Sequence, residues 1–465
     1  MQLKDAMLNG IAEQGGNIAQ FVSFAPDGIQ RFARIRGANP SRQFTTIEES
    51  VDKILQTGAP YVNIRSFLPE KPDGNPFFMG RKGFESLDRV AMKIRELMAQ
   101  GFYTIVNEEI DVMDGGFSGV LLGNIAEFAT RDIPRCVEKP GCAELPRLVV
   151  LEFARVVYDH RINIPYDRSY RVEFSVHPGP VGYAKQHQII WQIEKTEHGH
   201  EVAEPRPQWP NRVSEDMGDK AYGLLMAYLY GFRVPHTRVV GRVVPPFEFG
   251  EKTGSPEACW RRTCPKVQQP GLFTTKHGQI DPFALMQEED PQGDQIAAFI
   301  FQDDIEALYS GAAITDALGS VIIEGKGGHG DDFMVGTGVP DMHLPQHVDD
   351  GVRNIWEKAY AIFGPVRFEW CYDKTGTVWI VQFHTGQSAS VGNIIYPGDP
   401  ARFEIFEISD GLEALRQFVA KAKQEGFGIH LKGNVGITSH FGDLLWRNQI
   451  PSRLERTTAA PRIVA

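Results

Sequence analysis

The sequence predicts an α/β (α+β) protein with two related halves, built on mixed or antiparallel sheets, and a short C-terminal segment. Three observations lead to this prediction. Helical and strand-like hydrophobic patterns alternate along the whole chain. Six short motifs of the first half recur in the same order in the second half. Proline-rich stretches at 201–210 and 397–400 interrupt these patterns and divide the chain.

The periodic patterns place the individual elements in chain order. Six segments have apolar residues at the three- and four-residue spacing of one buried helix face. These expected helices span 46–57, 86–99, 145–155, 219–230, 347–361 and 411–424. Runs rich in β-branched and aromatic residues lie between them and are typical of strands. The expected strands span 61–65, 103–108, 119–122, 169–176, 188–193, 297–302, 320–324, 366–371 and 378–383.

The proline-rich stretches predict three parts, at 1–204, 211–396 and 401–465. At roughly 100–200 residues per domain, a chain of 465 residues has room for two to four domains. The repeat makes the first two parts related copies, although unrelated strands that resemble one another remain the alternative. The repeated motifs align Arg65 with Arg262, Gly119 with Gly311, Asn107 with Gln302, Glu138 with Glu324, Glu173 with Glu369 and Gln192 with Gln382.

Composition narrows the class of protein. The 48 basic and 59 acidic residues give a formal net charge of −11, and the clustered basic residues that nucleic-acid binding requires do not occur. No run of 18 apolar residues predicts a membrane span, and the N-terminal residues do not resemble a signal peptide. Five cysteines without a C-x-x-C pair are typical of reduced thiols. We therefore expect a cytoplasmic protein without structural zinc, in an oligomeric state that stays open.

Two basic residues of the second half are placed to bind phosphate. Lys220 opens the expected helix 219–230 beside small residues, so its ammonium group and the first helix amides can meet an anion together. Arg262 precedes a loop that ends at Thr275, where a guanidinium can bind phosphate oxygens through two hydrogen bonds. A solvated lysine at a helix start and a surface arginine in a turn are the structural alternatives.

A carboxylate and a carboxamide are expected to meet on adjacent strands. Glu369 and Gln382 lie in two apolar strand patterns, and the Asp-Lys-Thr-Gly sequence at 373–376 predicts a hairpin turn between them. Such a hairpin would bring both side chains to one face of the sheet. Oxygen ligands of this kind suit Mg²⁺ together with nucleotide phosphates. A buried hydrogen bond between the two side chains is the alternative.

The glycine-rich stretch 325–330 has the G-x-G-x-x-G spacing of dinucleotide-binding folds. The residues that follow, 331–336, have a strand-like or turn-like pattern rather than a helical one. Because that binding mode needs a helix N-terminus facing the phosphates, we expect no Rossmann-type site here.

Five motifs follow one another between residues 218 and 384. They are Gly218-Asp-Lys220-Ala with Val234-Pro235, Arg262-Thr263 with the 270–275 loop, Phe301-Gln302 with Ser310-Gly311, the stretch from Glu324 to Gly338, and Glu369 with Gln382. In this order they resemble the N-terminal nucleotide-binding domain of the phosphoenolpyruvate synthase, pyruvate phosphate dikinase and rifampin phosphotransferase family, which has an ATP-grasp architecture.

The resemblance implies ATP and Mg²⁺ as cofactors. It implies phosphate contacts by Lys220 and Arg262, metal contacts by Glu369 and Gln382, and further nucleotide contacts by Thr275, Gln302 and Glu324. Two positions depart from the family pattern, because Cys264 and His384 stand where a serine and a closing arginine are expected. The first half has no convincing lysine motif ahead of Arg65, so it is expected to be a degenerate copy.

One motif of the last segment contains a candidate phosphoryl acceptor, His440. Gly436-Ile-Thr-Ser-His440 with Ile450-Pro451 resembles two motifs of the swivelling phosphohistidine domain of the same family. The resemblance implies that His440 carries a phosphoryl group as a nucleophilic intermediate. A polar loop before a final helix at 441–448 is the structural alternative.

Together these features predict a Mg-ATP-dependent phosphotransferase with a duplicated ATP-grasp-like core, in which Lys220, Arg262 and His440 are catalytic. The acceptor would be His440 or an unidentified small molecule. A chain of 465 residues leaves no room for the C-terminal phosphoenolpyruvate barrel of a complete synthase. Two alternatives stay open: an ATP-grasp ligase that joins a carboxylate to an amine, and a non-catalytic nucleotide-binding protein.

Overall fold

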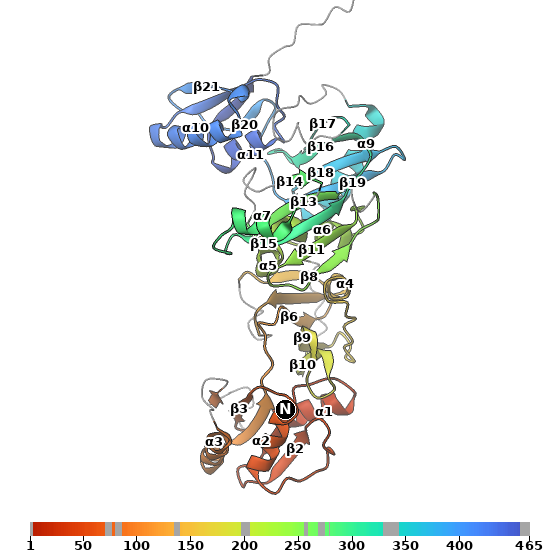
Figure 1. Cartoon of the computed structure of the whole chain (residues 1–465), viewed down its shortest axis with the longest axis vertical. Coiled ribbons are helices and arrows are strands. Elements are labelled where there is room, and N and C mark those ends of the chain that lie inside the picture. Colours follow the sequence, from red (N-terminus) through yellow and green to blue (C-terminus); the bar gives the residue numbers. More distant parts are fainter. Residues whose placement is uncertain are drawn as a thin grey trace, which may run out of the picture. The chain divides into compact units, whose positions relative to one another are not determined.

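The computed structural model describes residues 3–69, 77–79, 86–133, 140–196, 205–254, 259–267, 275–278, 280–328 and 344–455. The chain divides into two compact units, Met1–Pro205 (unit 1) and Arg206–Ala465 (unit 2). Within the described residues, each unit contains two antiparallel sheets, and unit 2 has a further, mixed sheet near its C-terminal end (Figure 1). The predicted α/β (α+β) class with antiparallel and mixed sheets is confirmed.

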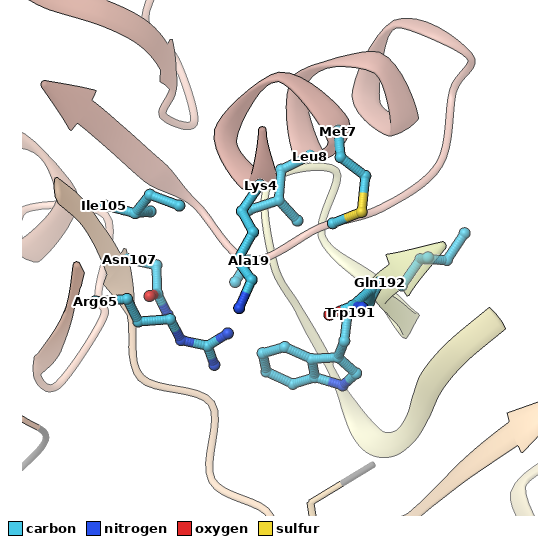
Figure 2. A pocket seen from close by; sticks show the side chains of 10 residues that line it. Lys4, Met7, Leu8, Ala19, Arg65, Ile105, Asn107, Trp191 and Gln192 are labelled. Atoms are coloured by element: carbon cyan, nitrogen blue, oxygen red, sulfur yellow. The ribbon is translucent and has the colours of Figure 1, made fainter. Parts of the chain in front are cut away.

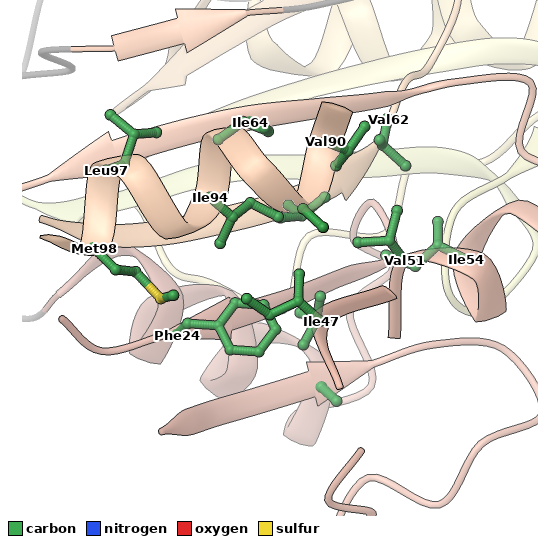
Figure 3. Close-up of a cluster of buried hydrophobic side chains, with 14 of the residues drawn as sticks. Phe24, Ile47, Val51, Ile54, Val62, Ile64, Val90, Ile94, Leu97 and Met98 are labelled. Atoms are coloured by element: carbon green, nitrogen blue, oxygen red, sulfur yellow. The ribbon is translucent and has the colours of Figure 1, made fainter. Parts of the chain in front are cut away.

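The first sheet of unit 1 has the strand order β2-β1-β5-β3-β4. Its strands are β1 (Phe21–Phe24), β2 (Gln30–Arg34), β3 (Val62–Phe67), β4 (Phe77–Met79) and β5 (Tyr103–Glu108). The helices α2 (Ile47–Leu55) and α3 (Leu87–Ala99) begin where the side chains of Thr46 and Ser86 accept hydrogen bonds from the first helix turn. Apolar side chains of both helices and of the strands form one buried core (Figure 3).

The second sheet of unit 1 has the strand order β10-β9-β6-β7-β8. Its strands are β6 (Phe117–Leu122), β7 (Ile125–Thr130), β8 (Ala143–Pro146), β9 (Tyr170–Val181) and β10 (Gln186–Lys195). Helix α4 (Arg147–Tyr158) packs on β7, β8 and β9. Helix α1 (Lys4–Glu13) contacts β2 of the first sheet and β10 of the second, so it connects the two sheets of the unit.

Unit 2 repeats this arrangement. Its first sheet has the order β12-β11-β15-β13-β14, and its second has the order β17-β16-β18-β19. The strands are β11 (Thr237–Gly241), β12 (Phe247–Phe249), β13 (Cys259–Pro265), β14 (Thr275–His277), β15 (Ile296–Asp303), β16 (Ala307–Thr315), β17 (Val321–Gly327), β18 (Val366–Asp373) and β19 (Val378–Thr385). Matched one to one in chain order, the first sheets of the two units have identical strand orders. The second sheets also agree, except that β8 of unit 1 has no counterpart among the described strands of unit 2.

Several described helices of unit 2 precede its C-terminal segment. They are α5 (Arg212–Met217), α6 (Asp219–Leu229), α7 (Pro282–Glu289) and α9 (Gln346–Phe363). Helix α6 is almost wholly buried and contacts both β13 and β19, which belong to different sheets. At Gly223 the helix comes so close to β19 that an added Cβ would lie 1.9 Å from the carbonyl oxygen of Phe383. Only glycine allows this approach.

The C-terminal segment belongs to unit 2 and has its own sheet and core. Its strand order is β20-β23-β22-β21, in which β21, β22 and β23 are parallel. The elements are β20 (Ile394–Tyr396), β21 (Phe403–Glu407), the 3₁₀ helix η2 (Ile408–Asp410), α10 (Leu412–Glu425), β22 (Gly428–Lys432), α11 (His440–Arg447) and β23 (Ser452–Glu455). Buried apolar residues of α10 and α11 pack together with those of the sheet.

Every helix and strand expected from periodicity is present, with ends that differ by at most five residues. The predicted hairpin turn between β18 and β19 is confirmed. The expected elements do not include α1, where Asn9 and Gly10 interrupt the apolar positions, nor α5 and α7. They also lack β7, β13, β16 and all the three- to five-residue strands of the described ranges. Short elements offer too few residues for a period to be recognised. None of the helices in the described ranges is long and apolar enough to cross a bilayer.

We expect Gly223→Ala to lower the melting temperature of the full-length protein by several degrees. The added Cβ would overlap the Phe383 carbonyl oxygen and push α6 away from β19, and overpacking of this kind costs about 1–3 kcal/mol. Gly10→Ala in α1 is the matched control, since nothing lies within 4 Å of an added Cβ there and alanine is the better helix former. Equal melting curves for the two variants would contradict the close packing of α6 on β19.

Candidate functional site

Lys220 lies in the first turn of α6, two residues after Gly218, which is the N-cap of this helix. Gly218 has φ = +91°, and an added Cβ there would lie 2.5 Å from the Sγ atom of Cys264. The chain can therefore enter α6 against β13 only with glycine at this position. In this place the Nζ atom of Lys220 donates to the carbonyl oxygen of Thr263 at 3.4 Å.

The Lys220 ammonium group is next to a second cation. Burial lowers the pKa of Lys220, and the charge of Arg262 lowers it further, whereas the Glu369 carboxylate acts in the opposite direction. Two cations that are partly removed from water repel each other, and an anion bound between them would offset both the repulsion and the desolvation. The structure thus brings the two predicted phosphate ligands together.

Arg262 and Gln302 converge on one backbone carbonyl of the other sheet. Nη1 of Arg262 and Nε2 of Gln302 donate to the carbonyl oxygen of Val381 at 3.3 and 3.2 Å. The antiparallel register of β13 and β15 places both side chains on one sheet face. Within the described residues, the Nε atom of Arg262 and the Oε1 atom of Gln302 are buried without a hydrogen-bond partner. A ligand could supply both partners.

Four residues form a row across the second sheet of unit 2. Glu324 on β17 pairs with Ala312 on β16, Ala312 pairs with Glu369 on β18, and Glu369 pairs with Gln382 on β19. Residues directly opposite in a sheet share one face. Glu369 and Gln382 are therefore neighbours on one face, as the sequence predicts, and both are half-buried. The register shifts directly after this pair, where Val381 forms a bulge.

Glu324, a predicted nucleotide contact, is hydrogen-bonded to the C-terminal segment. Its Oε2 atom accepts hydrogen bonds from both the backbone N–H and the side-chain Oγ1 of Thr438, each at 2.8 Å. The site row is thereby joined to the loop that leads into α11.

A buried ion pair makes a second connection between the sheet and α11. The guanidinium of Arg367 on β18 contacts the carboxylate of Asp443, whose side chain is 2% exposed. Arg447, one helix turn later, contacts the same carboxylate at 3.2 Å. Burial alone would raise the pKa of Asp443, but the charges of Arg367 and Arg447 hold it below its usual value.

These two connections place His440, the first residue of α11, in the site. The charges of Glu369 and Lys220 both act on its imidazole ring. Burial lowers the pKa of His440, so the ring is neutral at pH 7 and has a free lone pair. Its Nδ1 atom is buried and has no hydrogen-bond partner among the described residues. The charges of Glu369 and Lys220 thus reach the buried ring of His440.

Some predicted site residues lie elsewhere or are not described. Thr275 is exposed on the edge strand β14, where it pairs with Arg262 across the sheet. The Pro-Gly loop before it, residues 268–274, lies outside the described residues. The same holds for Glu138 and for most of the glycine-rich stretch after Gly328.

The two departures from the family pattern have structural roles. The thiol of Cys264 accepts a hydrogen bond from the Ala221 N–H at 3.3 Å, and burial raises the pKa of this thiol to about 12. A neutral thiol therefore supports the start of α6. Nε2 of His384 contacts Oδ1 of Asp219 at 2.9 Å, so this histidine holds the residue next to Lys220.

Sequence reasoning missed three features of the molecule. Nothing in the sequence pattern indicates that Arg367 and Asp443 meet, because they come from distant elements. The motifs did not single out Lys4, which is the first residue of α1, whereas Lys220 is the second residue of α6. The residue of the first half that is equivalent to Glu324 is Glu127, because Glu127 pairs with Val120 on β6 as Glu324 pairs with Ala312 on β16. A signal for Lys4 exists in the equal spacing of Lys4 to Gly15 and Lys220 to Gly231.

No protein-family model matches this chain, and no curated protein matches it. Solved structures of ligases match parts of it. L-amino acid ligase from Bacillus licheniformis matches with 12% identity and a TM-score of 0.26, over 38% of this chain and 43% of that chain. VanG D-Ala:D-Ser ligase from Enterococcus faecalis matches with 12% identity and a TM-score of 0.26, over 37% and 52%.

D-alanine–D-alanine ligase from Bacillus anthracis, complexed with ATP, matches with 15% identity and a TM-score of 0.25, over 38% of this chain and 57% of that chain. The matched regions thus span about half the length of these ligases. TM-scores this far below 0.5 establish neither a family nor a shared activity. The function proposed below rests on the site itself.

Asp443→Asn should destabilise unit 2 by about 3 kcal/mol at pH 7, because it leaves the Arg367 guanidinium buried without its counter-charge. The folded-state pKa of Asp443 is depressed, so its stabilisation is present above the unfolded-state pKa and is lost as the pH falls below about 4. Melting curves at pH 7 and pH 3 should therefore differ more for wild type than for the variant. Asp349→Asn, which breaks the exposed Arg353 pair, is the control and should cost less than about 0.5 kcal/mol.

Proposed function

We propose that unit 2 is an ATP-grasp-like enzyme that binds Mg-ATP and transfers a phosphoryl group to His440. The observation that carries this proposal is the pair of contacts that fix His440 beside the sheet of Glu369: Glu324 with Thr438, and Arg367 with Asp443. Phosphoryl transfer depends mainly on positioning and electrostatics. It therefore needs a cation at the phosphates and a nucleophile held close to them.

The residues suit a nucleotide. Lys220 and Arg262 supply two cations for the phosphates, and the unpartnered Nε of Arg262 is a further donor. The unpartnered Oε1 of Gln302 is an acceptor, which suits an amino group of a nucleotide base. Arg262 and Gln302 donate to the same carbonyl oxygen of Val381, so one ligand could meet the unpartnered atoms of both.

The residues also suit Mg²⁺. No group of three or more His, Cys, Asp or Glu side chains within the described ranges is placed to hold a metal alone. Mg²⁺ commonly takes one or two protein oxygens and completes its shell with water and nucleotide phosphates. Glu369 and Gln382 would supply the protein oxygens. When bound, the metal supplies charge neutralisation at the phosphates.

In the proposed step, a lone pair of the His440 imidazole forms a bond to phosphorus. The bond between that phosphorus and the bridging oxygen breaks, and the nucleotide leaves with the electron pair. Lys220 and Arg262 stabilise the negative charge on the phosphate oxygens. The Arg367–Asp443 pair positions the helix that carries the nucleophile. Phosphohistidine would then pass the phosphoryl group to a small-molecule acceptor.

A carboxylate–amine ligase is the second candidate. It shares the first chemical step, because an acyl phosphate forms when a substrate carboxylate takes the place of His440 as acceptor. The solved structures that match parts of this chain are ligases by name. Product analysis decides between the candidates. Amide formation with release of ADP, unaffected by His440→Gln, would favour the ligase.

Arg262→Met is expected to weaken Mg-ATP binding at least tenfold, because a charge-assisted phosphate contact is lost. Isothermal titration calorimetry measures the affinity. Arg261→Met is the matched control. Arg261 lies on the opposite face of β13 and stacks near the ring of Phe301, so its loss should leave the affinity unchanged. Equal affinities for both variants would remove the nucleotide site from unit 2.

Incubation with γ- or β-labelled Mg-ATP should give acid-labile phosphate on the wild-type protein and none on His440→Gln. The control is His430→Gln on β22, whose ring packs on Phe403 and should have no part in the reaction. Because burial lowers the pKa of His440, the labelling rate should reach its plateau at a lower pH than an ordinary exposed histidine would give. Label that persists in His440→Gln, or a rate that rises steeply above pH 7, would contradict the proposal.

A further inference from the structure

The strand register of unit 1 reproduces the register that builds the site of unit 2. In both units the first strand pairs with the fifth, and the fifth with the third, in the same alignment. The edge strand of the second sheet has its bulge at the same place, at Trp191 and at Val381. The equivalent residues are therefore Arg65 and Arg262, Asn107 and Gln302, Glu173 and Glu369, and Gln192 and Gln382.

Lys4 completes this set. It precedes the start of β1 by as many residues as Lys220 precedes the start of β11, and a glycine with positive φ, Gly15 or Gly231, follows each lysine at the same distance. The side chain of Lys4 is 9% exposed. Unit 1 therefore keeps both cations of the unit 2 site, although its sequence around them differs.

These residues line a cavity. Lys4, Arg65, Asn107 and Gln192 line it, and its enclosed volume is only about 20 Å³, within a more open space of about 460 Å³ that reaches the solvent. Figure 2 shows Lys4 reaching into the space between Arg65 and Trp191. Two cations, two amides and apolar walls suit a phosphate group beside a flat ring, and the open mouth leaves the rest of such a ligand in solvent.

The indole of Trp191 gives this cavity an aromatic wall at the bulge position. Trp191 stands at the bulge where unit 2 has Val381. Its Nε1 atom donates to Oγ of Ser175 at 2.7 Å, which fixes the orientation of the ring. An oriented aromatic ring beside two phosphate-binding cations suits a flat base attached to phosphate, because every nucleobase offers a face for stacking.

The carboxylate equivalent to the proposed metal ligand Glu369 is already paired with an arginine in unit 1. Glu173 is 5% exposed, and its carboxylate accepts a hydrogen bond from Arg171 at 2.6 Å. In unit 2 the equivalent arginine, Arg367, contacts Asp443 of the C-terminal segment instead, which leaves Glu369 without that partner. A carboxylate already neutralised by a guanidinium is a poor ligand for a divalent cation.

We propose that the Lys4–Arg65 cavity of unit 1 binds a nucleoside phosphate without a divalent cation and does not transfer its phosphoryl group. The ligand's phosphates lie between Lys4 and Arg65, and its base stacks on Trp191. The described part of unit 1 contains no element equivalent to α11, so it offers no counterpart of His440. The assignment by equivalent residues rests on the nucleotide site proposed for unit 2, but binding in unit 1 does not require phosphoryl transfer there.

Calorimetry of the full-length protein with ATP in EDTA tests this proposal. We expect one site per chain, at least tenfold weaker in Lys4→Met and in Arg65→Met, and unchanged in Lys220→Met. Melting curves with ligand absent, equal to that of wild type, show that the variants are folded. No binding in EDTA, binding that survives both changes, or binding lost only in Lys220→Met would each overturn the proposal.

Two further measurements address the ligand class and the metal. ATP should quench part of the tryptophan fluorescence of wild type but not of Trp191→Phe, and inorganic tripolyphosphate should bind more weakly than ATP. Equal affinity for tripolyphosphate would overturn the nucleotide assignment. In Lys220→Met, Mg²⁺ should not strengthen ATP binding, and a clear increase would overturn the metal-free assignment. Because the unit 2 proposal is tested through Arg262 and His440, either proposal can fail alone.

Discussion

The carbonyl group of Val381 is the point on which the arrangement of the unit 2 site depends. A bulge in β19 turns this carbonyl away from the strand ladder, and Arg262 and Gln302 of the other sheet both donate to it. The same strand accepts the close approach of α6 at Gly223, so Lys220 is positioned relative to β19 as well. One irregularity in one strand is therefore linked to the placement of side chains from three elements.

The C-terminal segment gives this site its difference from unit 1. Arg367 and Arg171 stand at equivalent positions, but each has a different carboxylate partner. Arg367 pairs with Asp443 of α11 and not with Glu369. The charge of Glu369 therefore acts on Lys220 and His440. In unit 1, Arg171 pairs with Glu173. The same scaffold thus has a carboxylate near a buried histidine in unit 2 and a carboxylate paired with an arginine in unit 1.

Much of the fold follows from the sequence, because long periodic segments have few alternatives. The alternation around Glu369 and Gln382, with a hairpin turn between them, predicts their pairing, and the register confirms it. The alignment of Gly119 with Gly311 is also confirmed, since at both positions an added Cβ would meet the neighbouring strand's backbone. The alignment of Glu138 with Glu324 is wrong, because motif similarity does not reveal which strand is the neighbour. The register gives that position to Glu127.

The sequence by itself determined the α/β class, the positions of the long helices and strands, and the residue types that suit phosphate and magnesium. These are local properties, set by periodicity, turn residues and side-chain chemistry over a few neighbouring residues. Only the tertiary structure decided that Glu324 accepts hydrogen bonds from Thr438, that Arg367 meets Asp443, and that Lys4 and Arg65 line one cavity. Each of these contacts joins elements that are distant along the chain, and its energy depends on burial and charge that no local pattern contains.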